Sequence, residues 1–352
     1  MERKPFVDEE AFEEEVTLKG RIFALAMRLL ALVLIVSSLM VSTDGLFVVI
    51  LLFVIVVPFE RLFPRHKGQK VRRPKLGTDI GYALASPILG ILTLVVAFFI
   101  AVISLAWIPA LLVAPYVAKI PTEWMPIIGF LLFDFLVYWT HRFYHEIEIL
   151  WKFHAIHHST EHLDWASGFR AHPLDGTILA PAFVFLIVAG FSPELTGAFA
   201  VAQLLTGLFL HANVSWRLKW LHKFIITPEF HHWHHTNERD AIWTNYSTFL
   251  PIWDIIFGTY FMPKNRRPQV YGVSEKIPDG IMLQLKHPLK GMPKPWWFLF
   301  HPFKSMKLIF STAKKIIKSM FKSAFRKRGT KPWDLYKSNS NDSKLELVID
   351  DK

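Results

Sequence analysis

Histidines gather in two short parts of the chain. Nine of the sixteen fall within residues 141–158 and 231–235, in the sequences HRFYH, HAIHH and HHWHH. Imidazole is a common ligand of transition metals, and histidines used only for packing would be scattered. The chain has no cysteine, which excludes disulfides, thiolate metal sites, iron–sulfur ligation and cysteine nucleophiles. Both parts of the chain are therefore predicted to bind metal.

The spacing of these histidines predicts helices that present imidazoles on one face. His141 and His145 are four residues apart, so their side chains project from the same side of a helix. The pattern H-x2-H-H occurs twice, ending at His158 and at His235. Because positions i+3 and i+4 both face position i, each such box is expected to offer one flanking and two adjacent ligands to a common centre.

The number of histidines exceeds the needs of one metal. A mononuclear zinc site uses three or four ligands, so the eight box histidines that fit these spacings, His232 not among them, imply two metals. A set made only of imidazoles suits zinc, copper, iron or nickel, and the spacing does not select among them. Asp134 lies on the same helical stripe as His141 and His145. Because a carboxylate within an apolar span is costly unless paired, Asp134 is a candidate hydrogen-bond partner of a ligand histidine.

Apolar helices must hold these boxes in place. Of the 352 residues, 52% are hydrophobic, and the mean hydropathy is +0.30. The basic loop at residues 64–77 is expected on the cytoplasmic side by the positive-inside rule. Four apolar runs are long enough, or nearly so, to cross a hydrocarbon layer of ~30 Å at ~1.5 Å per residue: residues 22–42, 45–59, 79–107 and 123–139. Four crossings from a cytoplasmic start return the chain to the cytoplasm near Thr140.

A second apolar pair follows the first two boxes, at residues 176–191 and 196–211. Each arm is shorter than the ~20 residues of a clean span, so either two crossings or a partly inserted helical hairpin fits the pattern. The predicted fold is an all-α integral membrane protein. It has about four transmembrane helices and a shorter apolar hairpin, and a cytoplasmic helical cap holds a histidine-rich dimetal site.

The chain divides by composition into six segments. Residues 304–328 alternate apolar residues and lysines at three- and four-residue intervals, which is typical of a basic amphipathic helix on a membrane surface. A helix docked on the protein's own soluble face, or one that binds a partner, is the alternative. The segments are a cytoplasmic N-terminal segment (1–21), transmembrane helices (22–140), a histidine-box catalytic region (141–262) with the apolar hairpin 176–211, a cytoplasmic loop region (263–303), the amphipathic helix (304–328) and a disordered tail (329–352).

The ends and the charge of the chain point to a membrane. The acidic first stretch does not read as a cleavable signal peptide, so the first span is expected to be retained. The formal net charge is +11. Because the basic residues stand beside apolar segments, attraction to anionic lipid explains this charge more simply than binding to nucleic acid, and no nucleic-acid partner is predicted.

The ordered boxes, followed by NYSTFLPIWDIIFGTYF, resemble the fatty acid hydroxylase superfamily of membrane-bound di-iron enzymes, which includes sterol desaturases and sphingolipid and fatty acid hydroxylases. The resemblance runs from about Asp134 to Phe261. It implies nine metal ligands: His141 and His145, then His154, His157 and His158, then the intervening His211, and finally His231, His234 and His235.

Four further positions are candidates beside these nine ligands. His172, in RAHPLD, and His232, where relatives carry Gln or His, are candidates for a ligand or for the hydrogen-bond partner of one, as is Asp134. Asp254, in the closing stretch, is expected to accept an N–H from a ligand histidine or to pair with Arg142 or Arg239. His162 matches no family position and is expected to be an exposed loop residue.

The resemblance implies an O₂-dependent enzyme with two iron ions that hydroxylates or desaturates an aliphatic C–H bond of a membrane lipid, such as a sterol, fatty acyl, sphingolipid or ether lipid. No flavin, haem or nicotinamide motif is visible, so electrons are expected from a separate protein, cytochrome b5-like or a ferredoxin with its reductase. The expected location is a bacterial inner membrane or the endoplasmic reticulum, with the boxes on the cytoplasmic side.

Two other functions compete with this interpretation. A zinc-dependent membrane hydrolase or a metal-handling membrane protein would also use clustered histidines. The absence of an H-E-x-x-H motif, and of a carboxylate placed as a general base within the boxes, counts against the hydrolase. A structural membrane protein whose histidines bind adventitious metal is the third possibility.

Overall fold

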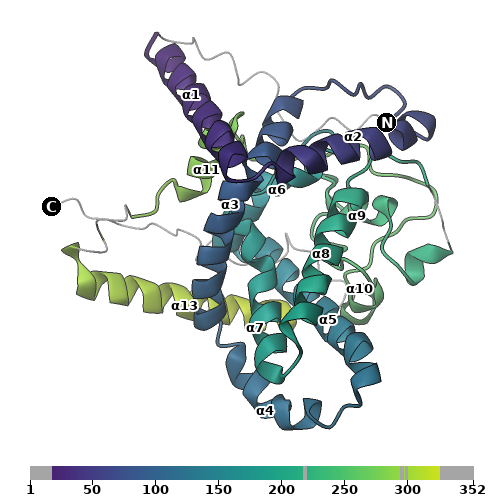
Figure 1. Cartoon of the computed structure of the whole chain (residues 1–352), viewed down its shortest axis with the longest axis vertical. Helices are drawn as coiled ribbons and strands as arrows, with labels where there is room; N and C mark the ends of the chain where they lie inside the picture. The colour runs from purple at the N-terminus through teal and green to yellow at the C-terminus, as the bar shows by residue number, and fades with distance from the viewer. Residues whose placement is uncertain (1–17, 217–219, 294–296, 298–299, 326–352) are drawn as a thin grey trace.

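The chain is helical throughout the part that the computed structural model describes, which is residues 18–216, 220–293, 297 and 300–325. Within these residues there is no strand, only two isolated backbone bridges. Five helices are long and apolar enough to cross a membrane. They are α1 (Leu18–Val41), α2 (Asp44–Leu62), α3 (Leu76–Ile103), α5 (Met125–Glu146) and α8 (Pro193–Leu210), shown in Figure 1.

These helices confirm the predicted fold class of an all-helical chain with membrane-length spans and a shorter apolar hairpin. The first arm of the hairpin is short, with a 3-10 turn, η4 (Asp175–Leu179), leading into α7 (Ala180–Ala189). Gly190 ends α7 with φ +104°, a conformation that favours glycine. Ser192 then caps α8 by accepting a hydrogen bond from the Leu195 N–H at 3.2 Å. The second arm, α8, is therefore a regular helix of full span length.

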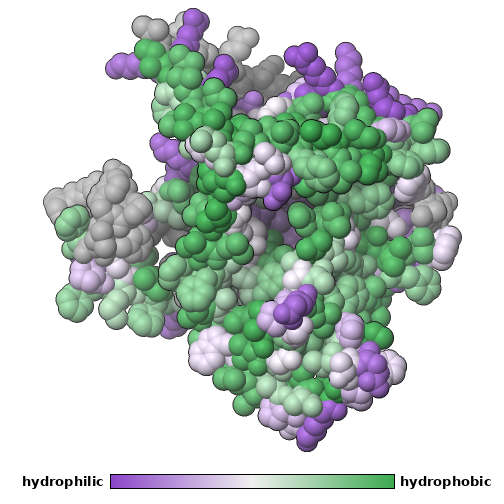
Figure 2. All heavy atoms as spheres, in the orientation of Figure 1, coloured by the Kyte–Doolittle hydropathy of each residue, from purple (hydrophilic) through white to green (hydrophobic). Residues whose placement is uncertain are grey.

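Apolar side chains cover the outer surfaces of the long helices. Figure 2 shows them as a nearly continuous apolar face over α1, α2 and α3. Met40, for example, is 84% exposed and Leu94 is 71% exposed. A water-soluble protein rarely exposes an apolar surface of this extent. The surface is the one expected of helices that face lipid.

Close helix packing builds the frame around the histidines. A buried cluster that includes Phe133, Leu186 and Phe199 joins α5, α7 and α8 with α4 (Trp107–Val117). On the other side α2 lies against α3, where a Cβ added to Gly45 would stand 2.5 Å from the Ala83 carbonyl oxygen. Glycine at this position therefore permits the close approach of the two helices.

Shorter helices complete the fold around the frame. Thr227 caps α9, its hydroxyl accepting from the Phe230 N–H at 3.3 Å, and Pro228 is the first residue of the helix. The remaining helices are α6 (Glu148–His158), α9 (Pro228–His234), α10 (Ile252–Phe257), α11 (Ile281–Lys286) and α13 (Pro302–Ala324). Most of the predicted N-terminal segment and the whole predicted tail lie outside the described residues.

Candidate metal centre

Four helices bring their carboxyl ends to one place. The first box occupies the last turns of α5, the second box ends α6, and the third box fills the end of the short α9. His211 follows the last residue of α8. The carboxyl end of a helix carries a partial negative charge of up to about half an electron. Four such ends therefore favour cations at a place where the imidazole groups carry no negative charge of their own.

Five of the nine predicted ligands form one buried group, called cluster A: His141, His145, His154, His158 and His234. The Nε2 atom of His154 lies 3.1 Å from that of His141, 3.0 Å from that of His145 and 3.1 Å from that of His158. All three boxes thus contribute to cluster A.

The other four predicted ligands form a second group, called cluster B: His157, His211, His231 and His235. Here the Nε2 atom of His211 is central. It lies 3.1 Å from that of His235, 3.3 Å from that of His157 and 3.3 Å from that of His231. The two clusters touch where the rings of His158 and His235 stack, with centroids 4.1 Å apart.

The adjacent histidines of each box separate between the two clusters. In α6, His154 and His158 join cluster A while His157 joins cluster B. In the third box, His231 and His235 join cluster B while His234 joins cluster A. The prediction that each box serves a common centre is therefore wrong. Adjacent residues point about 100° apart around a helix axis, so His157 and His158 cannot aim at one point as closely as the i and i+4 pair can.

Hydrogen bonds fix which ring nitrogen of each imidazole faces its cluster. The Nδ1 atom of His141 contacts the Tyr246 carbonyl oxygen at 2.7 Å, and that of His157 contacts the Arg170 carbonyl oxygen at 3.0 Å. Because a carbonyl oxygen only accepts, each Nδ1 must carry the proton and donate. Further Nδ1 bonds of this kind run from His211 to the Gly207 carbonyl oxygen at 2.6 Å and from His234 to the Thr244 carbonyl oxygen at 3.0 Å. Each bond leaves the Nε2 lone pair free for a metal.

The donor set and its spacing fit one metal ion in each cluster. Two nitrogens bound to one metal at about 2.1 Å lie about 3.0–3.4 Å apart for angles between octahedral and tetrahedral. The Nε2 separations fall in this range, whereas unprotonated nitrogens that face one another without a cation would repel. The Nε2 atom of His234 is buried and has no hydrogen-bond partner. Burial lowers the pKa of His154 to about 3 and that of His157 to about 4, so both are neutral at pH 7, as ligation requires.

Asp175 is a site residue that the sequence reasoning missed. Its Oδ1 atom accepts from the Nδ1 atom of His154 at 2.6 Å, and both groups are buried. A carboxylate in this position orients the imidazole and makes its other nitrogen a stronger ligand. Its signal in the sequence is modest: it stands three residues after His172, in the element RAHPLD that carries part of the family resemblance.

Replacing Asp175 by asparagine is expected to weaken metal binding in cluster A by roughly 10- to 100-fold, because the His154 imidazole loses its charged acceptor. Competition with a chelator, followed by elemental analysis of the purified chain, measures this loss. Glu194→Gln, at an exposed residue, is the matched control. Equal metal retention by both variants would contradict the role given to Asp175.

Asp134 and Asp254 hold the backbone of the closing stretch instead of a ligand imidazole. Asp134 accepts from the Phe249 N–H at 3.2 Å, the Leu250 N–H at 3.1 Å and the Trp253 indole N–H at 2.9 Å. Asp254 accepts from the Tyr246 N–H at 2.9 Å, the Ser247 N–H at 2.8 Å and the Thr259 hydroxyl at 2.5 Å. Neither carboxylate bonds a ligand histidine directly, as had been expected. Instead, the bond from the Tyr246 N–H to Asp254 helps to place the Tyr246 carbonyl against the Nδ1 atom of His141.

His172 and His232 lie outside both clusters. The Nδ1 atom of His172 accepts from the Leu174 N–H at 3.1 Å, and its Nε2 atom contacts the Leu285 carbonyl oxygen at 3.1 Å. His232 uses Nε2 for the Ala212 carbonyl oxygen at 3.1 Å and Nδ1 for the Tyr271 hydroxyl at 3.3 Å. Both imidazoles therefore use their two ring nitrogens in hydrogen bonds to other parts of the chain. His162 also lies outside the clusters, in a partly exposed loop.

A buried network of ion pairs holds Arg170, which contacts His157 of the second box. Arg73 contacts both oxygens of Asp164, at 2.5 and 2.6 Å, and Asp79 at 2.7 Å. Asp79 also accepts from Arg170 at 2.6 Å. Because the carbonyl of Arg170 receives the Nδ1 proton of His157, the network connects the start of α3 to a member of cluster B.

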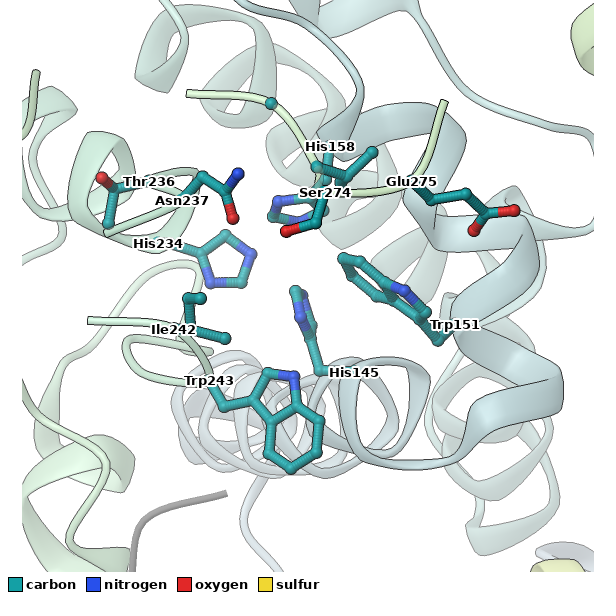
Figure 3. A pocket seen from close by; sticks show the side chains of 12 residues that line it. His145, Trp151, His158, His234, Thr236, Asn237, Ile242, Trp243, Ser274 and Glu275 are labelled. Atoms are coloured by element: carbon teal, nitrogen blue, oxygen red, sulfur yellow. The ribbon is translucent and has the colours of Figure 1, made fainter. Parts of the chain in front are cut away.

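A cavity of about 280 Å³ opens beside cluster A. It is lined by His145, His158 and His234, together with aromatic and polar side chains that include Trp151, Trp243, Asn237, Ser274 and Glu275, shown in Figure 3. Trp151 packs on the ring of His145 with centroids 5.2 Å apart. Trp243 has φ +63°, in the left-handed region that a bulky residue rarely adopts. No member of cluster B lines this cavity.

The fold and the site define an all-helical membrane protein with a paired histidine centre. Residues 126–259 match the family described as fatty acid hydroxylase. The resemblance to the fatty acid hydroxylase superfamily that the three boxes predicted is therefore confirmed over these residues.

Individual relatives act on lipids of several kinds. The chain is 31% identical over 163 residues to the ornithine lipid hydroxylase of Rhizobium tropici, covering 46% of this chain and 49% of that protein. It is 32% identical over 163 residues to the human alkylglycerol monooxygenase, covering 45% of this chain and 36% of that protein. A very-long-chain aldehyde decarbonylase of Oryza sativa subsp. japonica is 29% identical over 148 residues, which cover 36% of this chain and 21% of that protein.

The chain thus matches half or less of the length of these relatives. No solved structure gives a significant match.

Proposed function

We propose that the chain is an O₂-dependent di-iron enzyme that hydroxylates, or desaturates, an aliphatic C–H bond of a membrane lipid. The observation that carries this proposal is the separation of nine histidines into two buried clusters with ligand-like Nε2 spacing. The lipid oxidation named in two relatives supports the choice of chemistry.

Each part of the site has a role in this proposal. Clusters A and B would each hold one iron, and the bound pair would supply the activation of O₂ that lets one oxygen atom enter a C–H bond. In hydroxylation, two electrons and two protons would reduce the second oxygen atom to water. In desaturation, the same electrons and protons, with the two hydrogens lost by the lipid, would reduce both oxygen atoms to water. A separate electron-transfer protein would deliver the electrons. The chain's own residues hold the imidazoles through Nδ1, keep most of the centre away from bulk water, and leave an opening at cluster A through the cavity.

Labelled oxygen tests the proposal directly. The purified chain, loaded with iron and given a reducing system, is incubated with membrane lipid extracts under ¹⁸O₂, and the lipids are analysed by mass spectrometry. A lipid that gains one ¹⁸O atom, or loses two hydrogens only in the presence of O₂, is the expected result. Absence of both changes, with two irons bound, would contradict the proposal.

A zinc-dependent hydrolase is less well supported. No carboxylate belongs to either cluster among the described residues. Asp175 contacts the ring of His154, and the Glu275 carboxylate contacts the His287 ring at 3.0 Å. A hydrolase would need a carboxylate free to act as a general base on water. Lipid hydrolysis that proceeds without O₂, in protein that holds only zinc, would favour this alternative.

Asn237 and Ser274 are suited to hold a polar group of the substrate. Both side chains line the cavity, and Figure 3 shows them beside the imidazoles of His158 and His234. Neither side chain makes a hydrogen bond within the described part of the chain. The polar end of a lipid is therefore expected to enter here, which brings nearby carbons to cluster A.

Asn237→Leu and Ser274→Ala are each expected to raise KM for the oxidised lipid by roughly two- to tenfold, since one hydrogen bond contributes about 0.5–1.5 kcal/mol. The value of kcat should change little, because the bond is made before and during the reaction alike. Steady-state kinetics on the lipid found with ¹⁸O₂ measures both constants. Glu194→Gln, at an exposed residue that does not line the cavity, is the control, and a fall in kcat with KM unchanged would argue against a binding role.

A further inference from the structure

Helix α13 presents three different faces along its length. Six positions that recur at three- and four-residue intervals are buried or half-buried, and they form a narrow seam: Ser305, Leu308, Thr312, Ile316, Ser319 and Ser323. A second face is apolar and exposed, with Phe310 at 67% and Phe321 at 62%. The third face carries exposed lysines at positions 304, 307, 314, 315, 318 and 322, and the helix contains no acidic residue.

One arginine attaches the last turn of this helix to the membrane-length helix α5. The guanidinium of Arg142 donates to the Ser323 carbonyl oxygen, in the last turn of α13, at 2.8 Å. Arg142 is buried and also donates to Glu146 at 3.0 Å and to the Tyr138 hydroxyl at 3.2 Å. A cation at the carboxyl end of a helix is stabilising. In Figure 1 α13 extends from this attachment past α3.

The attachment leaves the apolar and lysine faces exposed. Phe310, Ile317 and Phe321 are exposed beside the row of lysines. A water-exposed face of this kind is unfavourable, because burying a side chain such as Phe or Ile gains about 1.5–3 kcal/mol. Hydrocarbon on one side and anionic groups on the other would satisfy both faces at once.

We propose that α13 lies along the surface of a bilayer that contains anionic lipids. The apolar face enters the boundary of the hydrocarbon, the lysines contact lipid phosphates, and the seam rests on the protein. Three observations support a bilayer over a protein partner: the chain's own membrane-length helices bring a bilayer within reach, the charge of the helix has one sign, and its tether is the helix α5. The proposal does not depend on the metals or on catalysis.

The absence of native cysteine makes the test clean, since every introduced cysteine is unique. Single-cysteine variants Phe310→Cys and Ile317→Cys report on the apolar face, and Ser311→Cys and Lys315→Cys are the matched controls beside it. Each full-length variant is nitroxide-labelled and reconstituted into nanodiscs of phosphatidylcholine, with or without one quarter phosphatidylglycerol. Collision rates with O₂, which partitions into hydrocarbon, and with a water-soluble nickel chelate are then measured.

Labels at 310 and 317 are expected to show a severalfold higher ratio of O₂ to chelate collisions than labels at 311 and 315. Replacing the six lysines by glutamine should remove any increase caused by phosphatidylglycerol. Equal access of the chelate to all four labels would overturn the proposal. Shielding of positions 310 and 317 from both reagents would also overturn it, because a second copy or another protein would then cover the face. Loss of lipid oxidation with the immersion pattern retained would count only against the catalytic proposal.

Discussion

His157→Ala and His158→Ala are each expected to abolish lipid oxidation, but through different metals. His157 belongs to cluster B and His158 to cluster A, so each variant leaves one cluster complete. We expect each to retain one of the two ions and to lose activity by more than the roughly 10- to 100-fold that removal of an outer hydrogen-bond partner costs. Elemental analysis, with a spectroscopic signature of the remaining ion, distinguishes the two variants.

The control for this pair is His162→Ala. His162 stands close by in the sequence but outside both clusters, so this variant should keep both ions and full activity. If the His157→Ala and His158→Ala proteins lost both ions together and gave identical spectra, a single shared centre would be the better description. Full activity in either variant would contradict the ligand assignment of the residue replaced.

Asp79→Asn is expected to lower the free energy of unfolding by about 3–5 kcal/mol, the usual effect of removing one partner from a buried ion pair. Asp79 lies between Arg73 and Arg170, at 2.7 and 2.6 Å, and all three side chains are almost fully buried. Without the carboxylate, Arg170 loses this ion pair. Thermal unfolding of the chain in detergent measures the change, and metal retention in cluster B should fall with it because Arg170 holds His157.

An exposed ion pair provides the comparison. Lys75 and Glu161 stand 2.7 Å apart, but their side chains are 30% and 57% exposed. Glu161→Gln should therefore change stability by no more than about 1 kcal/mol, because water and salt screen such pairs. Similar unfolding temperatures for Asp79→Asn and Glu161→Gln would mean that the buried network does not stabilise the fold.

The sequence predicted the long helices and the histidines that gather in clusters A and B because both leave strong local patterns. Long apolar runs located α1, α2, α3 and α5, and the spacing of His141 and His145 placed them on the continuation of α5. The second arm of the apolar hairpin was too short by composition to be assigned, and the cap at Ser192 with the regular helix that follows settles its form as a helix of span length.

The arrangement within the centre could not be read from the sequence. Four of the groups that orient imidazoles are backbone carbonyls, which every residue carries and no motif marks. Asp175 carries no positional signal apart from its nearness to His172. Asp134 lies on the expected helical stripe, yet its carboxylate reaches backbone N–H groups at Phe249 and Leu250. Only the tertiary fold decides which neighbour a buried carboxylate meets.

His157 and His158 belong to different clusters, and so do His234 and His235. The spacing of residues within each of these two boxes therefore positions ligands of both centres. Inserting one residue within either box would rotate every later histidine of that box by about 100° around its helix. Both centres would then be disrupted by the same change. Mutations that lengthen or shorten a box are therefore expected to remove both metals together, whereas point substitutions can remove one. The residue spacing within the second and third boxes therefore sets the geometry of both centres together.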